Sequence, residues 1–205
     1  GIAEITKINT QITNARTRII FLANPISKVI SNYSYGIQSI TDIVKASEDI
    51  ARFDYALVVA HNEVSIKDIN RHRNEISKEI CSSELEQQLI LWTWSKKINE
   101  IQFSDEAVKL IYKYSIELAG VYSFSIPLIQ GENIRIKIAK LSICFASRFY
   151  SNREQGKILY VDAVHVKCVL RFFDLIYKKC VSGYYDMSNF NKSLNINYSD
   201  FNFRP

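Results

Sequence analysis

Two short apolar runs constrain the fold of this chain more than any other feature. The segment 17–23 reads TRIIFLA and stops at Asn24-Pro25, and the segment 55–60 reads YALVVA. Runs of this length and β-branched content are typical of strands that are buried on both faces of a sheet. Pro25 has no backbone N–H to donate, so we expect the first strand to end there. A short helix expected at 39–47 separates the runs, and the order strand, helix, strand predicts an α/β sheet.

The chain after residue 65 shows helical periodicity instead. Apolar residues recur at three- and four-residue steps, which indicates helices with one buried face. The expected helices span 66–80, 84–98, 105–119, 132–150 and 163–180. Their expected N-terminal caps, where the sequence offers one, are Ser65, Ser83, Ser104 and Asp162. We therefore expect a predominantly helical chain.

Two further features complete this expectation. His165 lies three residues after Asp162, where a reciprocal cap is the expected role. The tail 184–205 is rich in Asn, Ser and aromatic residues and shows no period, so we expect it to be irregular.

Composition excludes several classes of protein. The 205 residues are 47% hydrophobic and 23% charged, which argues against disorder, and six Gly with three Pro exclude collagen-like and linker-like chains. Neither GxxxxGK[ST] nor GxGxxG occurs, so the chain cannot cradle nucleotide phosphates by itself. A net charge of +5 permits a nucleic-acid partner without requiring one.

The cysteines and the hydropathy of the sequence indicate where in the cell the protein is expected. The four cysteines form no CxxC pair and the three histidines are scattered, so we expect no metal site. Reduced cysteines within apolar helical patterns suit the cytoplasm. The sequence shows no leader pattern and no apolar stretch of about 18 residues, so we expect no membrane span.

Three motifs in a fixed order carry a resemblance to a known family. Residues 14–17 read NART before the first run, 23–25 read ANP at its end, and 49–54 read DIARFD before the second run. This succession resembles the minichromosome maintenance (MCM) type of AAA+ helicase, particularly the MCM-like replication helicases of bacterial mobile elements. The family pattern has SRFD where this chain has ARFD. The segments 135–141 (RIKIAKL) and 164–166 (VHV) look like lid helices of the same family.

The resemblance covers about residues 1–183 and implies an organisation. Residues 1–64 would be the C-terminal part of an AAA+ core, 65–183 a helical lid, and 184–205 an irregular tail. The fold class would be an α/β remnant of an AAA+ core followed by a mainly α-helical lid. The phosphate loop and the Walker B acids of the family are absent, and two strands are too few for a stable sheet. We therefore expect the C-terminal portion of a larger protein, inactive by itself.

Three nucleotide-contacting residues follow from the resemblance. Asn24 matches sensor 1, which orients the attacking water and binds the γ-phosphate; an Asn before Pro is also a common turn residue. Arg52 matches the arginine finger, which acts in a neighbouring subunit's site and is worth about 10³ to 10⁵ in rate. Its ordinary alternative is an ion pair with a nearby carboxylate. Arg135 matches the sensor 2 Arg, and a cation in the first turn of a helix suggests an anionic partner.

One residue of the resemblance concerns DNA. Residues 1–13 match the presensor 1 hairpin, whose Lys grips the nucleic-acid backbone, and Lys7 is the candidate. A lone Lys in a polar hairpin is otherwise simply solvated.

The function implied is that of an ATP-dependent DNA helicase and ATP hydrolase in DNA replication. The complete protein would use ATP and Mg²⁺, act on single-stranded or forked DNA, and assemble as a homohexameric ring in the cytoplasm. The chain alone would bind no cofactor. Two alternatives remain open: a non-enzymatic DNA- or protein-binding helical module, and an AAA+ remodeller unrelated to DNA.

Overall fold

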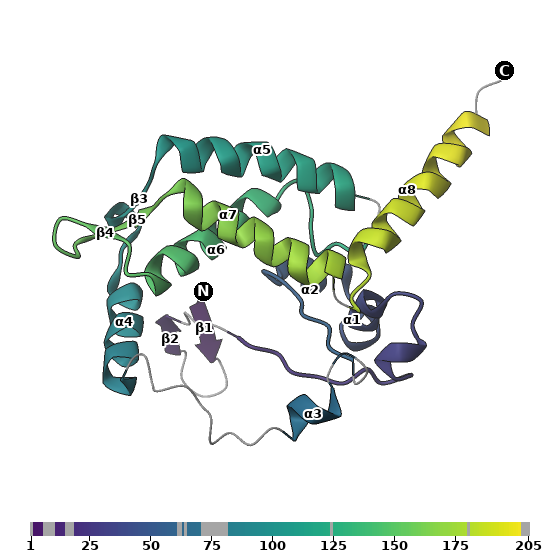
Figure 1. Ribbon diagram of the computed structural model, residues 1–205, viewed down its shortest axis with the longest axis horizontal. Helices are drawn as coiled ribbons and strands as arrows, with labels where there is room; N and C mark the ends of the chain where they lie inside the picture. The colour runs from purple at the N-terminus through teal and green to yellow at the C-terminus, as the bar shows by residue number, and fades with distance from the viewer. Residues whose placement is uncertain are drawn as a thin grey trace.

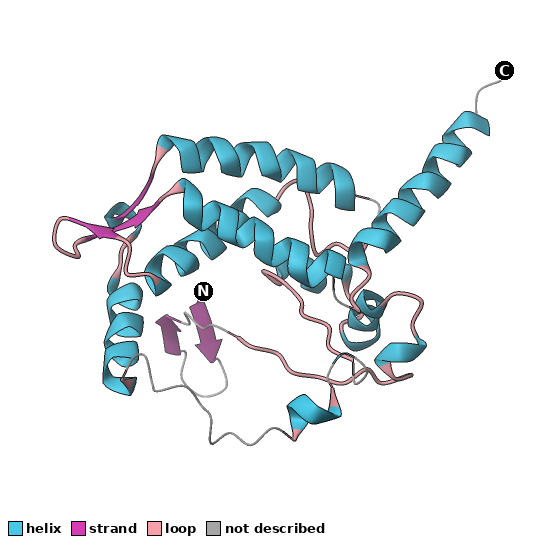
Figure 2. Cartoon of the chain, in the orientation of Figure 1, coloured by secondary structure: helices cyan, strands magenta, loops and turns pink. Residues whose placement is uncertain are grey.

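The computed structural model describes residues 2–5, 11–14, 19–60, 63, 65–70, 82–123, 125–179 and 181–201 (Figure 1). The helices are α1 (Ser39–Ile43), α2 (Ser47–Arg52), α3 (Ile66–Ile69), α4 (Ser83–Ser95), α5 (Asp105–Tyr122), α6 (Ile134–Arg148), α7 (Ala163–Asp174) and α8 (Tyr184–Phe201). The strands are β1 (Ile2–Ile5), β2 (Gln11–Asn14), β3 (Ile101–Phe103), β4 (Asn152–Arg153) and β5 (Ile158–Val161). Helices dominate (Figure 2), which confirms the expected predominantly helical class with a small β component.

The expected strand at 17–23 is wrong over the residues that the structure describes. Residues 19–25 form no strand, and Ile19, Ile20 and Leu22 expose 81%, 89% and 90% of their surface. The sequence has strand propensity, but a strand also needs a neighbour to accept and donate its backbone hydrogen bonds. No described segment pairs with these residues.

The second expected strand is also wrong. Residues 55–60 form no strand, and their burial alternates: Val58 and Ala60 are buried, whereas Leu57 and Val59 are exposed. The Ala56 N–H donates to the Tyr177 hydroxyl (3.4 Å) instead of to another strand. This segment therefore covers the core on one face only.

The helix starts follow the expected capping chemistry with one correction. Helix α4 is capped by Ser82 and not by Ser83, because the Ser82 Oγ accepts from the Leu85 N–H (3.3 Å). Ser104 caps α5, as expected. The reciprocal cap of Asp162 and His165 is confirmed, with the Asp162 N–H donating to His165 Nδ1 (2.9 Å).

Two expectations, the irregular tail and the helix 66–80, compare differently with the structure. The tail is not irregular: α8 runs through Tyr184–Phe201, because Tyr184 and Met187 anchor its first turns in the core. Helix α3 covers the start of the expected helix 66–80, and 71–81 lie outside the described residues.

The core lies where α5, α6, α7 and the start of α8 pack together, closed on one side by α1, α2 and the segment 55–60 (Figure 1). Buried residues from each part meet there: Ile37, Ile50 and Val58, then Ile111, Ile138, Val169, Tyr177 and Tyr184. One cluster thus spans both the first 64 residues and the helices that follow.

A small sheet extends one end of this helical body. Its strand order is β3-β5-β4, with β3 parallel and β4 antiparallel to β5. Leu159 and Val161 of β5 pack with Ala146 of α6 in a second small cluster. The sheet therefore fixes the C-terminal end of α6.

The expected N-terminal hairpin is confirmed, since β1 and β2 pair antiparallel with Ile2 opposite Asn14. Lys7 lies outside the described residues.

The remaining observations concern membrane-spanning helices and clusters of metal-ligating residues. None of the described helices combines the length and apolarity needed to cross a membrane. No group of three or more metal-ligating His, Cys, Asp or Glu occurs among the described residues.

Candidate functional site

Arg52 ends a short helix whose other face is anchored in the core. Helix α2 buries Ile50, so its orientation is fixed, while the Arg52 side chain remains 81% exposed. The guanidinium Nη1 contacts Asp49 Oδ1 at 3.1 Å, one turn earlier in the helix. An exposed pair of this kind contributes about 0 to 1 kcal/mol, so Asp49 orients the arginine without immobilising it.

Asn133, the N-cap residue of α6, and Lys140 within this helix contact the chain on both sides of Arg52. On one side, Asn133 Nδ2 donates to the carbonyl of Ala51 (3.2 Å). On the other side, Lys140 Nζ lies 3.5 Å from Asp54 Oδ1. Because both contacts come from one helix, the segment carrying Arg52 and helix α6 are tied together.

A buried lysine lies on the same helix. Lys137 is only 4% exposed, and its Nζ donates to the carbonyl of Leu128 (2.6 Å). Burial lowers the pKa of Lys137 to about 8, the Asp54 carboxylate opposes that shift, and Lys140 adds to it. Asp54 thus faces two lysines of α6, and its charge is part of what holds α6 against the Arg52 segment.

Arg135 lies in the first turn of α6 and is exposed. Its guanidinium lies over the Tyr112 ring, 5.3 Å from the centroid. The first turn of α6 has no acidic residue and no side-chain cap: the Asn133 Nδ2 group donates to Ala51, and its Oδ1 accepts no hydrogen bond. The positive end of α6 therefore remains available to an anion beside the segment that carries Arg52.

Asn24 is exposed within the extended segment before Pro25. No hydrogen bond or ion pair among the described residues joins it to Arg52 or Arg135. The turn that follows is held by Asp42 on α1, whose Oδ2 accepts from the N–H groups of Ile26 and Ser27, both at 2.7 Å. The Ser27 hydroxyl donates to the same carboxylate, and these bonds lower the pKa of Asp42 to about 2.

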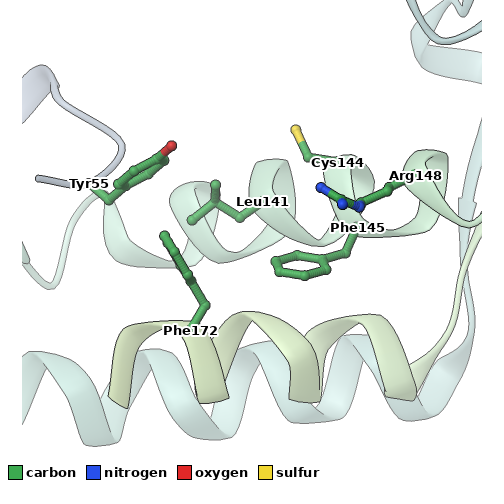
Figure 3. A pocket seen from close by; sticks show the side chains of 6 residues that line it. All are labelled: Tyr55, Leu141, Cys144, Phe145, Arg148 and Phe172. Carbon is green, nitrogen blue, oxygen red and sulfur yellow. The ribbon is translucent and has the colours of Figure 1, made fainter. Parts of the chain in front are cut away.

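An open apolar pocket lies beside the Arg52 segment, between Tyr55, α6 and α7 (Figure 3). Figure 3 shows Leu141, Cys144, Phe145 and Arg148 along α6, with Phe172 facing them from α7. The Tyr55 and Phe172 rings meet edge to face at 5.1 Å. The lining provides one cation, Arg148, and no carboxylate, so it offers no acid–base pair for hydrolysis.

The structure brings Arg52 and Arg135 onto adjoining segments, joins Asn24 to neither by a hydrogen bond among the described residues, and adds residues that sequence reasoning missed. These are Asn133, Lys137 and Asp42. Lys137 did give a signal, because it falls on the apolar stripe of α6 beside Ile134 and Ile138. The other two give none, because their partners lie far away in the chain.

The site is thus a set of exposed cations, Arg52, Arg135 and Lys140, on adjoining segments of the described part of the chain. Comparisons with protein-family models, with curated proteins and with solved structures found no match for this chain.

Proposed function

We propose that this chain is the C-terminal portion of an ATP-dependent, MCM-like AAA+ DNA helicase that acts in DNA replication in the cytoplasm. The main support for the proposal is that the Arg52 side chain is exposed while its backbone is held in place. Its side chain is exposed at the end of α2, while its backbone is held by the core and by α6. This is what a residue needs when its target belongs to another molecule.

In this proposal, Arg52 contacts the phosphates of an ATP bound by a neighbouring copy in a ring. A guanidinium placed there neutralises negative charge that develops on the transferred phosphoryl group. Asp49 is close enough to hold the free guanidinium until the neighbour arrives. Arg135 starts from the adjoining helix, so we assign it to the same phosphates.

Asn24 has a different role in the proposal. It would orient the attacking water in the site of its own subunit, as in the family that the motifs resemble. The hydrogen bonds of Asp42 to Ile26 and Ser27 support this assignment, because they fix the turn directly after Asn24-Pro25.

The described residues suit ATP and Mg²⁺ only in part. Arg52 and Arg135 are donors for phosphate oxygens, but the described residues provide no cluster of acidic ligands for the ion. In the proposal the ion helps to neutralise phosphate charge, and the groups that hold it lie outside this chain. The exposed apolar segment 19–22 also supports a place in a larger AAA+ sheet, because partner strands there would bury its apolar side chains.

The test uses the complete helicase with Arg52→Ala. We expect the ATPase rate to fall by about 10³-fold or more, whereas Arg171→Ala, an exposed arginine of α7, leaves it unchanged. Mixing Arg52→Ala protein with a variant that cannot bind ATP should restore part of the activity, since mixed interfaces combine one intact pocket with one intact Arg52.

Two outcomes would contradict the proposal. An Arg52→Ala protein with normal ATPase activity would remove its mechanism. A loss of activity without any stimulation of the wild type by DNA would favour an AAA+ remodeller unrelated to DNA.

A further inference from the structure

The turn between β4 and β5 is held in a conformation that few sequences adopt. Glu154, Gln155 and Gly156 all have positive φ angles, of 52°, 55° and 88°. Such conformations are unfavourable for residues other than Gly, and they persist where surrounding contacts enforce them. At Gly156 a side chain would also lie only 2.9 Å from the Tyr150 hydroxyl. Surrounding contacts must therefore hold the turn in this unfavourable backbone conformation.

Side chains of α4 enforce this conformation. Trp92 Nε1 donates to the Gly156 carbonyl (2.7 Å), and Lys96 Nζ donates to the carbonyls of Gly156 (2.6 Å) and Lys157 (2.9 Å). From the other side, the Gly156 N–H donates to Asn152 Oδ1 (3.0 Å). The Trp92 ring also packs on Tyr150, with centroids 4.7 Å apart. These contacts make a rigid platform at this end of the molecule.

The platform exposes aromatic rings. Phe149 exposes 65% of its surface and Tyr150 51%, although burying either ring would stabilise the folded protein. They lie three and two residues before the start of β4, and Tyr150 itself has a positive φ of 50°. Exposed aromatic rings on a rigid support provide surfaces for stacking.

The same platform exposes cations. Lys97, Arg153 and Lys157 are exposed, and none of the ion pairs among the described residues includes them. The Arg153 guanidinium lies over the Tyr160 ring, 3.5 Å from the centroid, which holds this planar cation in place. Three carboxylates lie near these cations: Glu100, which accepts from the Lys97 N–H, Glu154 in the turn, and Asp162, whose pKa the Arg153 charge helps to lower. With Lys96, which holds the turn, four cations at this end stand against three carboxylates.

We propose that these five residues, Lys97, Phe149, Tyr150, Arg153 and Lys157, form a surface that binds single-stranded DNA. We call it the aromatic–basic surface. Stacking platforms beside basic side chains bind single strands without sequence preference, because every unpaired base has a face to stack and every nucleotide has a phosphate. A duplex would not use the rings, since its bases are already stacked.

This surface is separate from the nucleotide-contacting residues. Figure 1 shows the β4–β5 turn at one end of the molecule, with α1 and α8 toward the other end. The inference adds a second DNA contact to the proposed function but does not depend on ATP hydrolysis. Its test therefore uses the 205-residue chain without nucleotide.

The experiment measures fluorescence anisotropy of labelled oligo-dT of about 16 nucleotides, over a series of salt concentrations. Arg153→Gln with Lys157→Gln should weaken binding about tenfold at low salt. It should also reduce the slope of log K against log salt by about 1.4, because each lost phosphate contact removes about 0.7. Phe149→Ala should weaken binding about tenfold with an unchanged slope, because a stacking contact carries no charge.

Lys45→Gln with Lys192→Gln is the matched control, because both lysines are exposed and lie just after α1 and on α8, toward the other end of the molecule (Figure 1). It should bind like the wild type, and circular dichroism should show all variants folded. A chain that does not bind oligo-dT overturns the proposal. So does binding that only Lys7→Ala reduces, or equal losses in the control pair and the turn pair.

Discussion

Asn133, the N-cap residue of α6, donates a hydrogen bond to the carbonyl of Ala51, the residue before Arg52. The donor and the acceptor are 82 positions apart in the chain. The bond places the N-terminal end of α6 against the C-terminal end of α2. Movement of α6 would therefore be transmitted to Arg52 through the backbone.

Asn133→Ala tests this link. We expect the free energy of unfolding to fall by about 1 kcal/mol, because the hydrogen bonds of Asn133 Nδ2 to the Ala51 carbonyl and to Gln130 Oε1 are both lost. Hydrogen exchange of the amides at 50–53 should increase more than that of the amides in α7. Asn133→Ser, which keeps a shorter donor, serves as the intermediate control. Unchanged exchange at 50–53 would show that Asn133 does not hold this segment.

Arg52→Ala should leave stability almost unchanged. Its only described ion pair is with Asp49, and both side chains are more than half exposed, so the loss should be below about 1 kcal/mol. Urea unfolding followed by circular dichroism measures this difference. A loss of several kcal/mol would instead mean that Arg52 is structural, and any loss of activity in that variant could not be read as catalysis.

Lys137 predicts a dependence of stability on pH. Burial lowers its pKa to about 8, below the ordinary value of 10.5. The unfolded chain therefore binds more protons than the folded chain between these values, so the contribution of Lys137 to stability rises with pH across that window. Below pH 8 the folded state bears the full cost of the buried charge. Above the ordinary value this cost is gone.

The measurement compares the wild type with Lys137→Met, which keeps the length of the side chain without its charge. From about pH 8 to pH 9.5, the free energy of unfolding of the wild type should rise relative to that of the variant, by at most about 2 kcal/mol. Higher pH is avoided because burial raises the pKa values of Tyr122 and Tyr184, whose contribution falls once unfolded tyrosines ionise. Parallel curves would mean that Lys137 is not buried in solution.

Asp42 predicts the opposite dependence, at acid pH. Its pKa is lowered to about 2, first by the hydrogen bonds of Ser27, so its stabilising contribution is present above its ordinary value of 3.8 and is lost as the pH falls toward 2. Asp42→Asn should accelerate hydrogen exchange at Ile26 and Ser27 at neutral pH. Glu48→Gln, an exposed acid on α2, is the control. Equal exchange in the two variants would contradict a role for Asp42 in fixing the turn after Asn24.

The sequence predicted the helices well because their signals are local. Ser104 and Asp162 cap the helices that they precede, and apolar spacing placed Ile138 and Val169 in the core. The two apolar runs were misjudged because strand formation depends on partners that a run of residues does not specify. Ile19 and Ile20 have the propensity of a buried strand, and they are exposed because no described strand lies beside them.

The candidate site was predictable only in part, for the same reason. Arg52 and Arg135 were identified from motifs, but their adjacency depends on the contact of Asn133 with Ala51, which no local pattern encodes. The tail was judged irregular from its composition. Its helix α8 instead depends on Tyr184, a single aromatic residue whose environment is set by distant parts of the chain.

Tyr184 therefore provides the sharpest test of how α8 is held. Its hydroxyl donates to the Ile126 carbonyl (2.6 Å) and accepts from the Ile129 N–H (3.2 Å), while its ring stacks on Tyr122 with centroids 4.4 Å apart. Tyr184→Phe keeps the ring but leaves the buried Ile129 N–H without a partner, while the Ile126 carbonyl keeps its bond from the Leu128 N–H (2.7 Å), so the change should cost about 2 kcal/mol. Tyr184→Ala also loses the ring and should cost about 3 to 5 kcal/mol. Tyr185→Phe, on the half-exposed neighbour, is the control and should cost less than either. Chemical unfolding of the four proteins gives these differences. If Tyr184→Phe unfolded like the wild type, the hydroxyl would not be holding the loop 126–129 against α8.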